Sequence, residues 1–252
     1  MRTCRSPFDE VSMKVLALST STHRGSAAVL DDDQVLGEGG HADLGGHAER
    51  IFSAVATALD VARVSLSEIA LVACDIGPGS FTGVRVGVAS AKGLALGLAV
   101  PLVGVGSLEA MAAAAFVAGV ARPDELVASV IDAKKQEFFL GVHDASGHAV
   151  FAPVHLPIAD APRVLSTEMS RLVHGSVGIC LVGEAALLEP SLATRVVRGA
   201  AMDLPDAVAI GRVARRRFAS SQGGAGEFDA AELEPSYVRP PDAKPMALEK
   251  ST

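Results

Sequence analysis

The residues with the clearest chemical potential lie between positions 75 and 87, in the stretch DIGPGSFTGVRVG. Backbone amides at the start of a helix can hold a phosphate, because they point at the anion and the helix dipole favours negative charge. The candidate nucleotide or anion loop comprises Gly77, Gly79, Ser80, Thr82 and Gly83. The alternative is a tight turn whose glycines let a helix lie close to a sheet.

The spacing of these residues matches neither common phosphate-binding motif. It is not GxxxxGK(S/T), and GxGxxG is broken because Thr82 stands where the third glycine belongs. We expect Thr82 instead to cap the helix that follows. The loop therefore favours close packing of a helix on a sheet over phosphate binding.

Arg85 lies in the first turn of the same predicted helix, where its positive charge opposes the helix dipole. This unfavourable position predicts a compensating anion nearby, which is a phosphate, a carboxylate of a partner or an internal aspartate. The alternative is an arginine that is simply solvated at the surface.

Two similar series of strands and helices must position these residues. The first predicts strands at 15–19, 26–30, 34–38, 69–74 and 101–105, with helices at 47–62, 84–98 and 108–118, the last capped by Ser107. The second predicts strands at 126–132, 137–142, 149–154, 178–182 and 195–198, with helices at 161–173 and 207–219. A shift that places Ser19 on Asp132 also places Val29 on Val142 without a gap, which suggests a duplication.

Two such units predict an α/β protein of two actin-like (ASKHA, ribonuclease-H-like) lobes, with mixed sheets flanked by helices. Actin, sugar kinases and Hsp70 share this fold, which places nucleotide between the lobes. The expected division is a loose extension at 1–12, an N-terminal lobe at 13–120, a C-terminal lobe at 121–222 and an extended tail at 223–252.

Phosphoryl transfer in this architecture needs an acidic side chain at the end of the first strand, to hold Mg²⁺ or activate a nucleophile. Ser19 stands there, and a hydroxyl cannot replace a carboxylate in that task. Asp132 occupies the equivalent place in the second lobe, either as such an acid or as a turn residue. The sequence contains no GxSxG, HExxH or HxxxH motif, so we predict no catalytic residue and no metal site.

Composition and charge limit the cellular compartment and the kinds of ligand expected for this chain. Its 252 residues are 49% hydrophobic and carry a formal net charge of −7, which disfavours binding of nucleic acid by this chain alone. Cys4, Cys74 and Cys180 are odd in number and form no CxxC, which favours a reducing compartment. We find no signal peptide and no apolar run long enough for a membrane span, and therefore expect a cytoplasmic protein.

Small residues form a stripe along the predicted helix 84–98, at Val84, Val88, Ala91 and Ala95. Such a stripe lets another element approach closely, and that element is either the sheet of the same lobe or the helices of a partner.

Five segments together carry a family resemblance: VLALSTST (15–22), HAERIF (47–52), IGPGSFTGVRVGVASAKGLALGLAVPLVGVGSLEAMA (76–112), VIDAKKQEFFLGV (130–142) and EPSYVRP (234–240). Together they resemble the TsaB (YeaZ) family across nearly the whole chain from Met13, and the long central block is the most specific. The resemblance implies a bacterial cytoplasmic, non-catalytic subunit of the complex that makes N6-threonylcarbamoyladenosine (t6A37) in tRNA.

The resemblance also implies partners. They are the paralogue TsaD, which transfers the threonylcarbamoyl group, the ATPase TsaE, a second copy of this chain, and tRNA only through the complex. ATP or ADP at the complex interface is the one cofactor to consider. Family members use the helices at 47–62 and 84–98 for TsaD and for self-association, so the expected interface is His47, Arg50, Ile51, Ala54, Val84, Arg85, Val88, Ala91 and Lys92. We expect Val88→Glu to abolish TsaD binding while leaving thermal unfolding nearly unchanged.

Two departures from related sequences bear on catalysis. TsaD-type proteins carry HxxxH where this chain has Ser107-Leu-Glu-Ala-Met111, which speaks against transferase activity. TsaB sequences commonly begin their first motif with Asp-Thr-Ser-Thr, whereas Ser19 stands here. The alternatives are an ATP-dependent kinase or ATPase, an endopeptidase of the glycoprotease type, and a homodimeric protein with another client.

Overall fold

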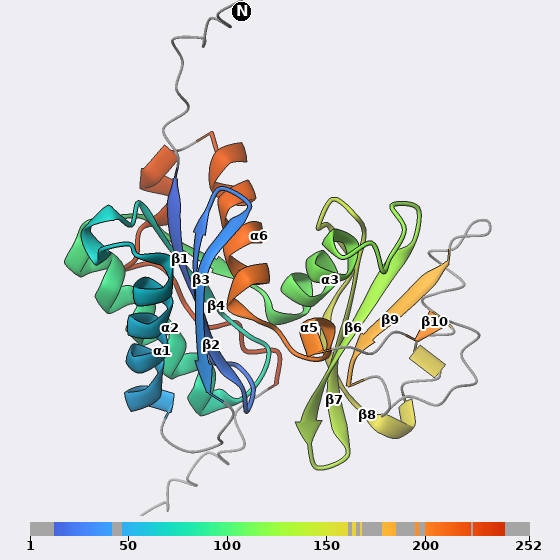
Figure 1. Cartoon of the computed structure of the whole chain (residues 1–252). Helices are drawn as coiled ribbons and strands as arrows, with labels where there is room; N and C mark the ends of the chain where they lie inside the picture. Colours follow the sequence, from blue (N-terminus) through green and yellow to red (C-terminus); the bar gives the residue numbers. More distant parts are fainter. Residues whose placement is uncertain are drawn as a thin grey trace, which may run out of the picture.

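Two five-stranded sheets form the framework of the protein (Figure 1). The structure, a computed structural model, describes residues 13–41, 47–160, 163–164, 167, 178–184, 195–196, 200–222 and 224–239. The first sheet contains β1 (Lys14–Ser19), β2 (Gly25–Asp31), β3 (Gln34–His41), β4 (Leu71–Asp75) and β5 (Leu102–Val105), in the order β3-β2-β1-β4-β5. The second contains β6 (Leu126–Lys134), β7 (Glu137–His143), β8 (Ala149–Pro157), β9 (Ile179–Gly183) and β10 (Arg195–Val196), in the order β10-β9-β6-β7-β8.

The two sheets have the same topology, because β6 to β10 occupy the places of β1, β2, β3, β4 and β5 in turn. In each sheet the first strand is antiparallel to the second and parallel to the fourth. The predicted duplication is therefore confirmed, but its gapless alignment is not. If the gapless alignment held, Ser129 of β6 would pair with Val142 of β7. The structure instead pairs Ser129 with Gly141, and the register between β6 and β7 shifts between Asp132 and Lys134.

The helices fall largely where the apolar spacing predicts them. They are α1 (His47–Ala62), α2 (Phe81–Leu98), α3 (Ser107–Val117), α5 (Ala200–Asp203) and α6 (Ala207–Ser220), with short 3₁₀ turns at Leu66–Glu68, Ile158–Asp160 and Gly224–Phe228. Only residues 163–164 and 167 of the predicted helix at 161–173 are described, and they are helical. The last two residues of the predicted strand at 195–198 lie outside the described residues. In the described ranges no helix is long and apolar enough to cross a bilayer.

Helices cover both faces of the first sheet. Leu16 and Leu18 of β1 face the side covered by α1 and α2, whereas Val15 and Ala17 face α6. A strand covered on both faces has no solvent side, which explains why this segment reads as a continuous apolar run rather than an alternating pattern.

Helices α3 and α6 are exchanged between the sheets, contrary to a simple division at residue 120. In Figure 1, α6 lies beside β1, whereas α3 lies toward β6. Leu108 and Met111 of α3 pack with Val127 and Ile131 of β6, and Ile210 of α6 packs on the first sheet. The predicted boundary assigns α3 to the first lobe and α6 to the second. In the structure, α3 packs on the second sheet and α6 packs on the first.

The segment after α6 is not an extended tail over its described length. It turns through Gly224–Phe228 and then returns along the first lobe. Ala230 is buried in the core beneath α1 and α2, and the Ser236 amide donates to the Ile76 carbonyl oxygen at 2.7 Å. We call residues 229–239 the strap, because its end reaches the second lobe, where the Arg239 guanidinium donates to the Ala133 carbonyl oxygen at 3.0 Å.

Candidate functional site

Three glycines allow α2 to pack against the turn that follows β1. A Cβ atom on Gly79 would lie 2.2 Å from the carbonyl oxygen of Ser21, and one on Gly83 would lie 2.1 Å from that of Thr20. One on Gly87 would lie 2.2 Å from the Thr20 hydroxyl, which itself donates to the Gly83 carbonyl oxygen at 2.7 Å. No side chain fits at such distances, so the close-packing interpretation of these glycines is confirmed.

Several amides at the start of α2 are already used within the chain. Ser80, and not the predicted Thr82, caps the helix: its hydroxyl accepts from the Gly83 amide at 3.3 Å. The Ser80 amide donates to the Ser21 carbonyl oxygen at 2.6 Å, and the Gly77 amide donates to a buried carboxylate at 2.9 Å. These contacts occupy groups that would otherwise face an anion, which weakens the case for a nucleotide loop.

The buried carboxylate is Asp75, at the carboxyl end of β4. It is 1% exposed and accepts hydrogen bonds from the Ser19 hydroxyl at 2.9 Å, the Ser107 hydroxyl at 2.5 Å, the Gly77 amide at 2.9 Å, and the Ser21 hydroxyl. Burial raises the pKa of Asp75, while these hydrogen bonds act in the opposite direction. The cluster fastens the ends of β1 and β4 to the start of α3.

Sequence reasoning considered Ser19 and Ser107 separately and missed their common partner. A usable signal was present, because β1 and β4 are neighbouring parallel strands and their carboxyl ends meet at one edge of the sheet. Ser107 is not a cap as predicted: Gly106 is the N-cap residue of α3, and Ser107 is its first helical residue. Its hydroxyl is therefore free to reach Asp75.

The two α3 positions compared with HxxxH have structural roles here. Ser107 donates to Asp75, and Met111 is buried in the core between α3 and the second sheet. Within the described part of the chain, no group of three or more His, Cys, Asp or Glu side chains is placed to hold a metal ion.

Arg85 lies against two aromatic side chains of the described part of the chain. Its guanidinium lies 3.7 Å from the centre of the Phe81 ring, and its Nε donates to the Tyr237 hydroxyl at 2.9 Å. The two rings lie 5.5 Å apart and tilted. A cation over aromatic faces is stabilised without an anion, which explains how this charge is tolerated in the first turn of a helix.

Most of the predicted interface residues on α1 and α2 point into their own lobe. Ile51, Ala54, Val84, Val88 and Ala91 are buried in the core against the first sheet. Their small and branched side chains match the sheet and not a partner, so their assignment to a contact surface is wrong.

The charged members of the predicted interface lie differently. Arg50 and Arg85 are exposed, while Lys92 is partly buried and donates to the Ala231 carbonyl oxygen of the strap at 3.0 Å. The side chain of His47 lies outside the described residues. The outward face of these helices instead presents large apolar side chains, among them Phe52 (50% exposed) and Leu96 (62% exposed).

A cavity of about 680 Å³ lies between the two lobes. Its walls come from the turn after β1, the start of α2, the β6–β7 hairpin and the strap. Asp132, the counterpart of Ser19, lines it and forms an ion pair with Lys134 at 2.7 Å. Its other carboxylate oxygen accepts the Lys134 amide at 2.7 Å, as a turn residue would, which supports the structural interpretation of Asp132.

The arginine run of α6 is largely neutralised by neighbouring acids. Arg215 pairs with Asp32 at 3.3 Å and with Asp33 at 3.1 Å. Nη2 of Arg217 donates to both carboxylate oxygens of Glu109 of α3, at 2.7 and 2.8 Å. The Arg217–Glu109 pair joins the two exchanged helices.

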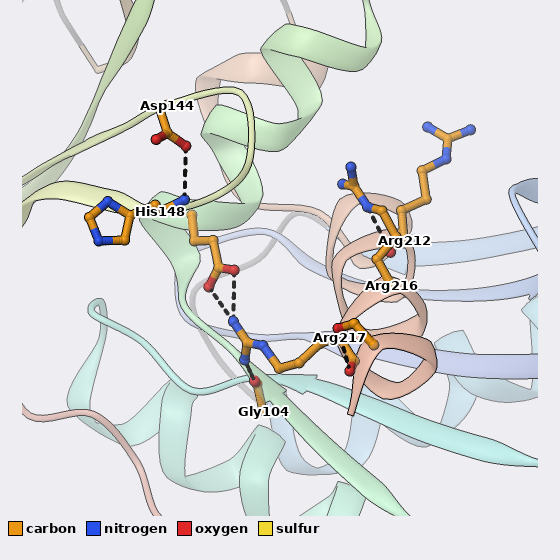
Figure 2. Close-up of polar contacts among 8 residues, drawn as sticks. Gly104, Asp144, His148, Arg212, Arg216 and Arg217 are labelled. Carbon is orange, nitrogen blue, oxygen red and sulfur yellow. Dashed lines mark hydrogen bonds and ion pairs between the residues drawn. The ribbon is translucent and has the colours of Figure 1, made fainter. Parts of the chain in front are cut away.

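The same end of α6 faces the turn between β7 and β8, as Figure 2 shows. Arg217 also donates to the Gly104 carbonyl oxygen, and Asp144 accepts the His148 amide at 3.0 Å across that turn. A cavity of about 460 Å³ between them is lined by both signs of charge, including Asp144 and Arg216. Mixed charge of this kind offers no uniformly basic surface to a nucleic acid.

The duplicated sheets, exchanged helices and interlobe cavity define a two-lobed α/β protein of the actin-like ATPase fold. A hexokinase of the ROK family from Thermus thermophilus shares this fold, with a TM-score of 0.52 and 15% identity over 83% of this chain and all of that one. YeaZ from Pseudomonas aeruginosa is closer in structure, with a TM-score of 0.70 and 26% identity over 89% of this chain and 99% of that one.

Sequence comparison specifies the family. The family model for tRNA N6-adenosine threonylcarbamoyltransferase, TsaD, matches residues 45–161. The tRNA threonylcarbamoyladenosine biosynthesis protein TsaB of Escherichia coli (strain K12) is 31% identical over 232 residues, which cover 90% of this chain and 95% of that protein. The chain belongs to the TsaB family, as its sequence motifs predict.

Proposed function

We propose that this chain is a non-catalytic subunit of the machinery that makes N6-threonylcarbamoyladenosine in tRNA, and that it binds and activates the paralogue TsaD. The role in biosynthesis is supported by the function named for the Escherichia coli relative. The pairing is supported by the likeness of residues 45–161 to the TsaD family model, since that segment includes α1 and α2.

The observation that carries the proposal is the apolar outward face of α1 and α2. Leu96 is 62% exposed on the side of α2 away from the sheet, and a Cβ atom on Gly93 would meet no atom within 4 Å. Large exposed apolar side chains beside open small positions are typical of surfaces that bind another protein.

A non-catalytic role is supported by the cluster around Asp75. The carboxylate expected at the end of β1 is replaced by Ser19, whose hydroxyl is used to hold Asp75. Ser107 and Met111 stand where TsaD-type proteins carry metal-binding histidines, and both are buried. Contacts with tRNA would then be made by the assembled complex, in which TsaE is a third component.

Leu96→Asp tests the interface. It places a charge on the proposed contact face without entering the core, and we expect the affinity for TsaD to fall about thirtyfold or more, the effect of losing a hot-spot residue. Val117→Asp is the matched control, because Val117 is 53% exposed at the end of α3 and away from this face. Val88→Glu is unsuitable, since Val88 is buried and the substitution would destabilise the fold.

Co-purification of the full chain with TsaD measures binding, and light scattering of the chain alone measures self-association. Loss of self-association with retained TsaD binding would assign the face to a homodimer and refute the proposed pairing. Mass spectrometry of tRNA nucleosides, with each subunit omitted in turn, tests the function. Product from this chain alone, or undiminished product without it, would refute a non-catalytic accessory role.

A further inference from the structure

The walls of the interlobe cavity are mostly apolar and aromatic. Three rings face it from separate segments: Phe81 at the start of α2, Phe139 in β7 and Tyr237 in the strap. Aliphatic side chains complete the wall: Val84, Ile131, Leu204 and Val238. The volume of about 680 Å³ lies within the range of small-molecule sites, which is roughly 300–1,000 Å³.

The charged side chains of the wall are matched within the protein. Asp132 pairs with Lys134 at 2.7 Å, and the Asp132 amide donates to the Glu184 carboxylate at 2.6 Å. Arg239 pairs with Glu137 of β7 at 3.3 Å. A charged ligand would have to displace one of these contacts, and a charge left unmatched in an apolar cavity is costly.

Several polar groups on the side of the cavity that could have received phosphate are also hydrogen-bonded within the chain. The Ser80 amide donates to the Ser21 carbonyl oxygen, and the Ser80 hydroxyl accepts the Gly83 amide. These polar groups are thus engaged with one another. Phe81 and Tyr237 are about half exposed, whereas Phe139 is buried in the wall.

We propose that this cavity binds a neutral, flat, mostly apolar small molecule, whose ring system stacks on the exposed rings of Phe81 and Tyr237. Offset stacking on such rings adds to the free energy gained by removing apolar surface from water. Because the wall contains segments of both lobes and of the strap, a bound molecule would hold the lobes together and raise the unfolding temperature.

The uncharged fluorophore N-phenyl-1-naphthylamine, titrated into the purified full chain, is the probe. We expect saturable binding with one site per chain, and an affinity about five- to tenfold weaker in Phe81→Ala, the effect of losing one stacking ring. Phe81 is 47% exposed, so its removal spares the core. Tyr237→Ala is a second variant, and thermal unfolding of each variant verifies the fold.

Phe52→Ala is the matched control, because Phe52 is equally exposed but lies on α1 and does not line the cavity. We expect it to bind the dye as the unaltered chain does, and adenosine to displace the dye at lower concentrations than ATP. Binding that is not saturable, binding that is unchanged in both Phe81→Ala and Tyr237→Ala, weakening in Phe52→Ala, or stronger displacement by ATP would each overturn the proposal.

Discussion

Replacing Gly83 with alanine tests whether α2 lies too close to the turn after β1 for any side chain. The added Cβ atom would lie 2.1 Å from the Thr20 carbonyl oxygen, where an ordinary contact is at least 3.4 Å. The two backbones would have to separate by about 1 Å, and overpacking of this kind costs about 3 kcal/mol. Alanine returns about 1 kcal/mol because it is a better helix former than glycine.

The expected net loss is therefore about 2 kcal/mol of unfolding free energy, which lowers the unfolding temperature by about 4–8 °C in a chain of this size. Gly93→Ala is the matched control on the same helix, because its Cβ atom would meet nothing within 4 Å. It gains the helix-forming term without the clash, so its unfolding temperature is expected to rise by about 1–4 °C.

Differential scanning calorimetry of both variants and of the unaltered chain, without added ligand, provides the comparison. The reasoning is refuted if Gly83→Ala unfolds at or above the temperature of the unaltered chain. A glycine needed only for phosphate binding would give that result, since its replacement would affect the ligand and not the empty protein.

Three further outcomes follow from the buried and strained positions. Burial raises the pKa of Asp75, so the stabilising contribution of this side chain is complete below the ordinary value of 3.8 and is lost as pH rises through the folded pKa. In urea unfolding, the free energy of unfolding of Asp75→Asn should therefore increase relative to that of the unaltered chain over this rise in pH. A difference between the two that does not change with pH would contradict this. Ala99 ends α2 in the left-handed region with φ 54°, so Ala99→Gly should raise the unfolding temperature by roughly 1–3 °C, and no rise would mean that the strain is relieved elsewhere. Cys74 and Cys180 are buried, and burial raises the pKa of the Cys74 thiol. A Cys4→Ser variant, which retains only these two thiols, should therefore react with dithionitrobenzoate only after unfolding. Rapid reaction of the folded variant would argue against this burial.

Local pattern was sufficient to predict most of the secondary structure. The apolar spacing at 47–62 predicts α1 with the bounds the structure has, and the strand predictions are within a few residues at most ends. These features depend on contacts between residues close in sequence, whose periodicities of 3.6 and 2 can be read directly. The spacing of the glycines between Gly77 and Gly83 fits neither phosphate motif, so the sequence also favours close packing over phosphate binding.

The Asp75 cluster was only partly predictable. Ser19, Asp75 and Ser107 are far apart in sequence, and only the pairing of β1 with β4 brings the first two together. The sequence shows that Ser19 replaces an acidic residue, but it does not predict that the Ser19 hydroxyl bonds to Asp75. The sequence likewise indicates that the charge of Arg85 needs compensation, but it does not predict the aromatic partner Tyr237. Tyr237 lies in the strap, which the sequence predicts only as an extended tail.

The sequence by itself determined the family, the duplicated strand order and the small-residue stripe on α2. Only the tertiary structure decided that Val84 and Val88 of this stripe face their own sheet, that α3 and α6 exchange lobes, and that the strap closes a cavity between them. The physical reason is that burial of an apolar stripe stabilises a helix against any surface that fits it. Which surface fits depends on the shape of the whole assembled chain, and no local pattern records it.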